Sequence, residues 1–182
     1  AASGIEFLRT LKCFSKVGVL GHSEGGSIAF MLGAKGKVDF VISMAGIGVR
    51  GDTALTVQAN RLLELSGQPM RLSTLQYRVN AYMKKSPWLN FFMDYDPSGD
   101  ISKTLCPVMV INGERDVQVI SSLNLIGIKA HLTENPKNFV KEYPALNHLF
   151  QHCTTGNVSE YRMIEETISP EVLEDIVHFI KQ

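Results

Sequence analysis

The chain has 182 residues, of which 45% are hydrophobic, and its 18 basic side chains balance 18 acidic ones. Because binding to nucleic acid or to an anionic membrane surface depends on excess positive charge, this balance leads us to expect neither partner. No apolar run approaches the ~18 residues of a membrane-spanning helix, and no signal peptide is evident, so the sequence assigns no compartment. Three cysteines without metal-binding or redox spacing favour reduced, structural thiols.

The first informative feature is a strand, a sharp turn and a helix near the N-terminus. Residues 3–12 form one predicted helix, with Ile5, Leu8 and Leu11 on one face, and residues 17–20 form an apolar strand. Directly after it comes Gly-His-Ser-Glu-Gly-Gly at 21–26, followed by an apolar helical stretch. This is the context of a nucleophile elbow, in which Ser23 projects from a tight turn. Such a turn leaves no room for side chains at the flanking positions, which explains the glycines at 21 and 25. Gly26 is expected to let the helix pack closely on the sheet.

Further along the chain, short apolar runs alternate with helical patterns, which is typical of a parallel sheet flanked by helices. The other strand candidates are 40–44, 108–112 and 139–143. The first two are nearly continuous apolar runs, as expected for strands covered on both faces, whereas Lys141 and Glu142 suit an edge strand.

A predicted helix over 170–182 closes the fold, with Ser169 as its N-cap and Pro170 in its first turn. Its apolar positions are expected to face the core; they are Val172, Leu173, Ile176, Val177 and Ile180.

Taken together, these motifs resemble the α/β-hydrolase superfamily, near its dienelactone-hydrolase and acyl-peptidase branch. The resemblance implies that the loop after strand 108–112, with Gly-Glu-Arg-Asp at 113–116, carries the triad acid. It implies likewise that Asn-His-Leu-Phe at 147–150 is the histidine loop. Ser23, Asp116 and His148 then stand in the chain order of this fold.

Each proposed site residue has rivals. Glu114 and Asp52 are alternative acids, although Asp116 is favoured as the group that orients the imidazole from a strand end. His152, with Cys153 beside it, is four residues from His148, but the Glu of a helical zinc-protease motif is replaced by Leu149, so we expect no metal. His22 is expected to line the site.

Residues 50–104 form an insertion between the second and third strands. Residues 53–66 read as one helix ended by Gly67, and an apolar stripe marks a second; the stripe is Leu72, Leu75, Val79, Tyr82 and Met83. Residues 87–95 then hold four aromatics. In the resembling family an insertion here forms a helical cap, and Trp88, Phe91 and Phe92 either pack that cap or wall a substrate pocket.

The resemblance implies a serine hydrolase that cleaves a small-molecule carboxylic ester without a cofactor. His148 would activate Ser23, and the backbone N–H of Glu24 would stabilise the oxyanion. A peptidase, a thioesterase and a catalytically silent fragment remain alternatives.

Only twenty residues precede Gly21, so we expect a partial α/β-hydrolase fold of about four strands over 1–182, without the earlier strands and the second oxyanion donor. Activity of this chain by itself would then be impaired. The elbow strand would be an open edge, so self-association through it is expected.

Overall fold

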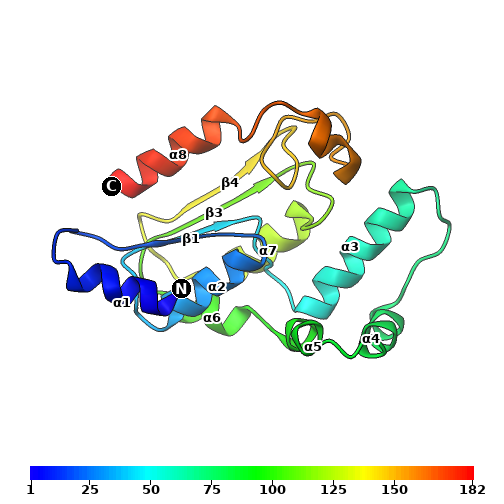
Figure 1. The fold of residues 1–182 in the computed structure, drawn as a ribbon, viewed down its shortest axis with the longest axis horizontal. Helices are drawn as coiled ribbons and strands as arrows, with labels where there is room; N and C mark the ends of the chain where they lie inside the picture. Colours follow the sequence, from blue (N-terminus) through cyan, green and yellow to red (C-terminus); the bar gives the residue numbers. More distant parts are fainter.

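A computed structural model describes all residues, 1–182, and contains one four-stranded parallel sheet (Figure 1). The strands are β1 (Val19–His22), β2 (Val41–Met44), β3 (Val108–Gly113) and β4 (Phe139–Tyr143), in the order β1-β2-β3-β4. The register pairs Val19 with Val41, Val41 with Val108, and Met109 with Phe139. All four strands therefore end at the same edge of the sheet, where the loops that follow them meet.

The burial of the strands follows their apolar content, as predicted. Every residue of β2 and β3 is buried, and β4 is an edge strand with three half-buried residues and an exposed Glu142. The other edge is β1, where Leu20 is 49% exposed and only β2 provides a neighbour. β1 begins two residues later than expected and includes Gly21 and His22.

Helices cover both faces of the sheet (Figure 1). On one face lie α2 (Glu24–Ala34), α6 (Ser98–Lys103) and α7 (Ser121–His131), and on the other lies α8 (Pro170–Lys181). Alternate strand residues supply the two cores: Val41 and Val108 pack with Phe30 of α2, whereas Ile42 and Met109 pack on the α8 side. This alternation is the period-2 geometry of β-strands.

The terminal helices bury fewer residues than their apolar patterns suggest. α8 begins after Ser169, whose side chain makes no capping hydrogen bond, and it carries Pro170 at its first position. Its buried residues are Val172, Ile176 and Phe179, while Leu173, Val177 and Ile180 are 41–48% exposed, so that part of the prediction was wrong. A helix lying on a sheet buries a narrow stripe, and that stripe here runs through Phe179.

The predicted N-terminal helix is α1 (Ala2–Thr10), and it too buries little of its apolar face. Only Ile5 is buried, and Leu8 and Leu11 are 38% and 47% exposed. None of the helices in the chain has the length and apolar character needed to cross a bilayer.

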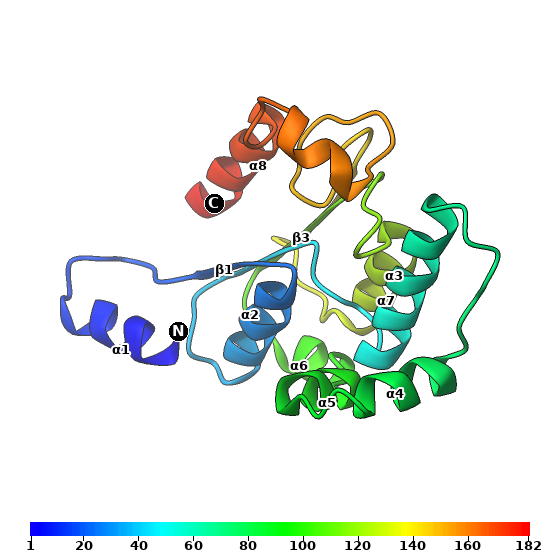
Figure 2. The same ribbon diagram turned by 45° about the vertical axis from the view of Figure 1, so that its right-hand side comes forward.

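The predicted insertion forms a helical lobe beside the sheet (Figure 2). It contains α3 (Gly51–Leu65), α4 (Thr74–Tyr82) and α5 (Pro87–Asp94), and α6 follows. α4 packs through Tyr77 and Ala81 against Leu55, Leu89 and Met93. The predicted apolar stripe lies on the side of α4 that faces away from the lobe: its members from Leu75 to Met83 are exposed, and the lobe is held together through other residues.

Candidate active site

Ser23 occupies the turn between β1 and α2 in a strained conformation. Its backbone has φ 58° and ψ −120°, a region that non-glycine residues rarely adopt, and such strain costs on the order of 1–3 kcal/mol. Its N–H is held by the carbonyl of Met44 at 2.8 Å. Although Ser23 stands at the N-cap position of α2, its side chain makes no capping hydrogen bond, so the hydroxyl is not engaged by the helix it precedes.

The glycines of the motif differ in what they do. A Cβ on Gly21 would lie 1.8 Å from the carbonyl oxygen of Gly25, and one on Gly26 would lie 2.6 Å from Ser43 Oγ. Gly21 therefore permits the tight turn, and Gly26 the close packing of α2 on the sheet, as predicted. Gly25 has no heavy atom within 4 Å of such a Cβ and no positive φ, so the steric reason expected for it is wrong.

Asp116 lies in the loop that follows β3, with its carboxylate fully buried. One oxygen, Oδ1, accepts backbone N–H groups from Gln118 and Val119, both at 2.8 Å. The other, Oδ2, lies 2.7 Å from His148 Nδ1. Because a carboxylate only accepts hydrogen bonds, Nδ1 is the donor in this contact, and in the neutral imidazole the free lone pair is then on Nε2.

His148 lies in the loop after β4, and this loop is held rigidly over the ends of the strands. The side-chain oxygen of Asn147 accepts the N–H groups of Leu149 and Gln151, at 2.9 and 3.1 Å. Gly113 lets the loop approach β3, because a Cβ there would lie 2.3 Å from the carbonyl oxygen of Leu146. His148 is consequently 5% exposed and restricted in orientation.

The rival residues are engaged elsewhere. Glu114 accepts the N–H of Ala145 at 2.9 Å, and Asp52 forms ion pairs with Arg50 and Arg78. His152 is exposed and contacts Glu166 through Nδ1 at 3.0 Å. No group of three or more His, Cys, Asp or Glu side chains is arranged to hold a metal ion.

His22 connects the elbow to the histidine loop, a contact that the sequence did not predict. Its Nε2 donates to the carbonyl oxygen of His148 at 2.8 Å, and the two ring centroids lie 4.6 Å apart. Burial lowers the pKa of His22, and the neighbouring His148 lowers it further, although the bond to the carbonyl acts in the opposite sense. Since His22 is next to Ser23 in the chain, this contact brings the serine turn and His148 to the same place.

Tyr161 is a second neighbour of the site that sequence reasoning missed. It lies in a 3₁₀-helix, Val158–Met163, and its hydroxyl accepts a hydrogen bond from Gln118 Nε2 at 3.0 Å. Burial raises the pKa of Tyr161 to about 12, and the charge of Asp116 contributes in the same direction. No motif in the sequence marks this residue, because its position depends on how the segment after β4 folds back.

The lobe touches the elbow through one hydrogen bond. Trp88 Nε1 donates to Glu24 Oε1 at 2.6 Å, and the indole stacks on Phe92 with centroids 5.5 Å apart. Phe92 is buried, whereas Trp88 and Phe91 are 51% and 61% exposed. Of the three aromatic pocket candidates, Trp88 is thus the one in contact with the elbow.

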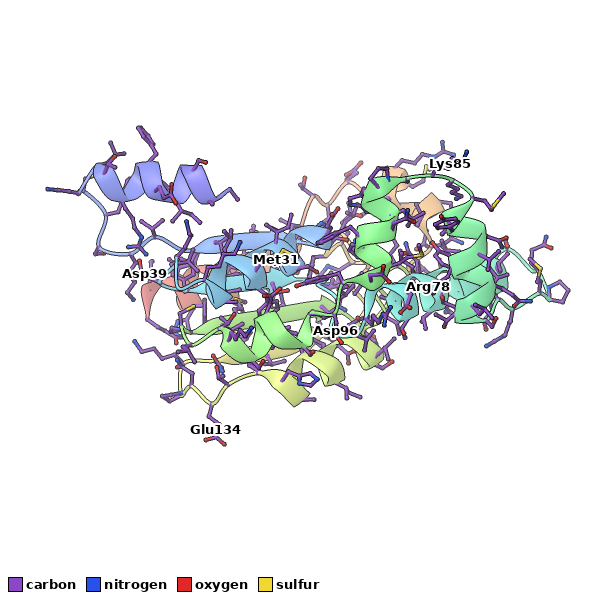
Figure 3. All side chains as sticks on the ribbon, turned by 90° about the horizontal axis from the view of Figure 1, so that it is seen from below. Met31, Asp39, Arg78, Lys85, Asp96 and Glu134 are labelled. Atoms are coloured by element: carbon purple, nitrogen blue, oxygen red, sulfur yellow. The ribbon has the colours of Figure 1, made fainter.

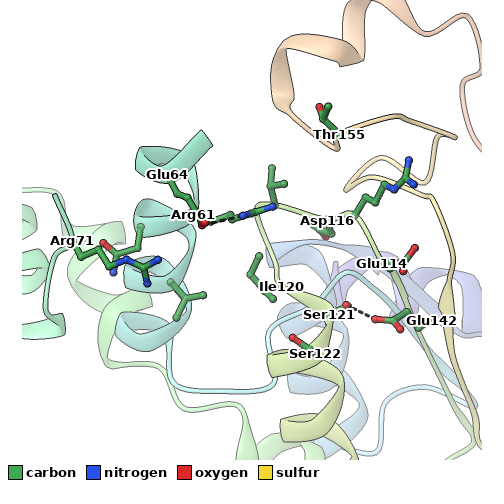
Figure 4. Close-up of a pocket in the computed structure, with 14 residues that line it drawn as sticks. Arg61, Glu64, Arg71, Glu114, Asp116, Ile120, Ser121, Ser122, Glu142 and Thr155 are labelled. Carbon is green, nitrogen blue, oxygen red and sulfur yellow. Dashed lines mark hydrogen bonds and ion pairs between the residues drawn. The ribbon is translucent and has the colours of Figure 1, made fainter. Parts of the chain in front are cut away.

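The large cavity beside Asp116 has a charged lining instead of an aromatic one (Figure 4). It measures about 680 Å³ and lies between α3 and the loops after β3 and β4. Arg61, Arg71 and Glu142 are among its lining residues, and Ser121 donates to Glu142 within it. A second cavity, of about 490 Å³, lies beside His22 and is walled by Leu149, Phe150 and residues 164–168.

Comparison with solved structures shows the fold. An esterase of Pyrococcus furiosus matches with a TM-score of 0.59 and 15% identity, over 99% of this chain and 59% of that one. A bromoperoxidase of Bacillus anthracis matches with a TM-score of 0.56 and 16% identity, over 100% and 73%. A 2,6-dihydroxy-pseudo-oxynicotine hydrolase matches with a TM-score of 0.52 and 17% identity, over 81% and 39%. The chain thus spans about 39% and 59% of the first two structures found.

A search of curated proteins by sequence finds no match. A family model described as the C-terminal region of BAAT and acyl-CoA thioester hydrolases matches residues 2–152. These residues include β1 to β4, Ser23, Asp116 and His148. The structural neighbours confirm the predicted α/β-hydrolase fold. The family match is more specific than a shared fold, because a sequence model of one family matches most of the chain. The chain belongs to the BAAT and acyl-CoA thioester hydrolase C-terminal family.

Proposed function

We propose that this chain carries the catalytic triad of a serine hydrolase that cleaves acyl esters through an acyl-enzyme on Ser23. The observation that carries the proposal is the buried 2.7 Å contact between Asp116 Oδ2 and His148 Nδ1. It is joined to the Ser23 turn by the hydrogen bond from His22 to the carbonyl of His148. The loops that carry Ser23, Asp116 and His148 all follow strands that end at one edge of the sheet, which supports their proposed roles as nucleophile, orienting acid and base.

In the proposed mechanism, His148 acts as the base through Nε2. Asp116 accepts a hydrogen bond from His148 Nδ1–H, so Nε2 takes the proton of the Ser23 hydroxyl as Ser23 Oγ attacks the acyl carbonyl carbon. The protonated imidazole then gives that proton to the leaving oxygen or sulfur, and the bond from carbon to the leaving group breaks. Water, deprotonated by His148, attacks the acyl-enzyme and releases the acid together with free Ser23.

Glu24 is the proposed oxyanion donor. It is the first residue of α2, and the first N–H groups of a helix have no partner within that helix. The positive end of the helix dipole adds to the attraction for a developing negative charge. We assign this role to the backbone of Glu24, while its side chain is already engaged by Trp88.

The proposed substrates are small carboxylic esters, with thioesters as a second candidate class. Oxygen esters and thioesters form the same acyl-enzyme and differ only in the leaving group. The family match, whose description names acyl-CoA thioester hydrolases, specifically favours the thioester candidate.

Labelling with a fluorophosphonate, which reacts covalently with an activated serine, tests the nucleophile. The wild-type chain should be labelled, and Ser23→Ala should not. Ser27→Ala is the matched control, because Ser27 is four residues further on, in α2, and is 2% exposed. Labelling of Ser23→Ala at the wild-type rate would overturn the assignment.

The leaving group is tested separately by comparing an aryl ester and a CoA thioester of the same acyl group. A kcat/KM for the thioester more than about tenfold above that of the ester, a difference of about 1.4 kcal/mol, would select the thioester candidate. The reverse ratio would select oxygen esters. Neither ratio alters the assignment of Ser23, which depends on the labelling alone.

A further inference from the structure

The charges of the helical lobe are unevenly distributed. Residues 66–93 contain four basic side chains, Arg71, Arg78, Lys84 and Lys85, and not one Asp or Glu. The rest of the chain therefore has an acidic excess that cancels this local positive charge. The zero net charge of the whole chain, from which we expected no membrane partner, conceals a cationic segment.

The same segment exposes large apolar side chains on one face of α4. Leu75, Val79, Tyr82 and Met83 are 72%, 56%, 70% and 73% exposed, and their i, i+4, i+7, i+8 spacing places them on one side of the helix. α4 packs on the lobe through its opposite side, by Tyr77 and Ala81. We call Leu75, Val79, Tyr82 and Met83 the α4 patch.

The α4 patch borders a groove of about 440 Å³ between α4 and α5. Met93 lines the groove together with the patch, and Arg78 and Asp94 lie at it as an ion pair of 2.7 Å. Arg78 is also paired with Asp52, so its charge is neutralised within the lobe.

Lys84 and Lys85 supply the free positive charge. They follow α4 directly, are exposed, and form no ion pair. Figure 3 shows Lys85 at the connection between α4 and α5, at the margin of the molecule, while Arg78 lies further in. A surface of four apolar side chains with two unpaired lysines beside it is thus open on the outside of the lobe.

Exposed apolar side chains beside unpaired lysines distinguish among the partners that could bind this surface. A second copy docked by two-fold symmetry would bring the lysines of both chains together without a carboxylate from either segment, which is unfavourable. A small soluble anion would contact the lysines but leave the apolar side chains in water. An anionic lipid surface matches both, since headgroups attract lysines and the acyl boundary accepts apolar and aromatic side chains.

We propose that the α4 patch, with Lys84 and Lys85, docks the protein on membrane surfaces that contain anionic lipid. The patch enters the headgroup boundary while both lysines remain at the level of the phosphates. No helix crosses the bilayer in this arrangement. The binding does not depend on Ser23, so it holds or fails independently of the proposed catalytic function.

Vesicle co-sedimentation tests the charge component, with the Ser23→Ala chain used throughout so that no lipid is hydrolysed. Vesicles of phosphatidylcholine with phosphatidylglycerol should bind the protein, and vesicles of phosphatidylcholine alone should bind it far less. A lysine near an anionic surface contributes about fivefold to partitioning, so Lys84→Gln with Lys85→Gln should lower it about 25-fold. The control, Lys129→Gln with Lys181→Gln, changes two exposed lysines on α7 and α8 and should bind like the parent.

A second pair of variants tests the apolar component. Val79→Ser with Met83→Ser should lower partitioning by about tenfold or more, because each removes apolar surface from the boundary. Ile126→Ser, at a 68% exposed position on α7, should not. Raising the salt concentration from about 0.01 M to 0.15 M shortens the Debye length from about 30 Å to 8 Å and should weaken binding of the parent.

Three results of the vesicle experiments would overturn the proposal. They are equal binding to both kinds of vesicle, equal losses in the control variants, and no binding to the anionic vesicles. Sedimentation showing a dimer that dissociates in Val79→Ser with Met83→Ser would also overturn it, by assigning the α4 patch to self-association. Because all substituted side chains are exposed, thermal unfolding should confirm that the variants fold.

Discussion

Asp116→Asn is the substitution that most directly tests the proposed triad, because it changes one charge with almost no change in shape. In the structure Asp116 accepts two backbone N–H groups through Oδ1 and the imidazole proton through Oδ2. An asparagine can keep its oxygen on the two N–H groups, so the loop should fold as before. Its amide nitrogen then faces His148 Nδ1 and can only donate there.

The magnitude follows from the tautomer that this donation imposes. With Nδ1 as an acceptor, the ring proton moves to Nε2, and His148 can no longer take the proton of Ser23. Loss of the correct tautomer typically lowers turnover by about 10⁴, which is about 5.5 kcal/mol of transition-state stabilisation. We expect the rate of fluorophosphonate labelling to fall at least 10³-fold, whereas the free energy of unfolding should change by only about 1.5–3 kcal/mol, the contribution of one charged hydrogen bond.

Labelling rates and denaturant unfolding of the two chains, measured in parallel, provide the assay. Glu114→Gln is the matched control. Glu114 is also a carboxylate in the loop after β3, but it accepts a hydrogen bond only from the N–H of Ala145. The labelling rate of Glu114→Gln should lie within about threefold of the wild-type rate, because the substitution weakens at most one hydrogen bond outside the proposed triad. Asp116→Asn labelling within tenfold of wild type, or a fall of the same size in Glu114→Gln, would refute the reasoning.

Three further predictions concern the elbow and the strand beside it. Gly21→Ala should destabilise the fold by about 1–3 kcal/mol and abolish labelling because its Cβ clashes with the Gly25 carbonyl, whereas Gly25→Ala should be tolerated; equal effects in denaturant unfolding would contradict this. Since burial lowers the pKa of His22, the folded chain resists its protonation, so the free energy of unfolding should fall as pH drops below about 6.5, and His22→Gln should remove that part of the fall. An unchanged pH slope in His22→Gln would exclude the effect. Because β1 is an open edge, we expect self-association in sedimentation that Leu20→Lys abolishes and Ile126→Lys does not; a monomeric wild-type chain would exclude it.

The pattern of neighbouring residues was sufficient to predict most of the strands and the Ser23 turn. The continuous apolar runs predicted the buried strands β2 and β3, and charged residues predicted the edge position of β4. A strand followed by a glycine-flanked serine and an apolar helix predicted the Ser23 turn, which the structure shows with positive φ. These features depend on the periodicity and backbone freedom of neighbouring residues, and both are written into consecutive positions of the chain.

Tertiary structure decided which apolar face is covered and which distant residues meet. The stripe on α4 has the periodicity of a core face, yet only packing against α3 and α5 determines that Tyr77 and Ala81 point inward and Leu75 outward. Likewise, nothing local predicts that His22 reaches the carbonyl of His148, 126 residues away, because that contact depends on a loop crossing from β4 to β1. Sequence by itself therefore determined the elements and the types of residue at the strand ends. Burial and long-range contact are properties of the assembled layers, so only the folded chain determined the hydrogen bond between Asp116 and His148 and the exposure of the α4 patch.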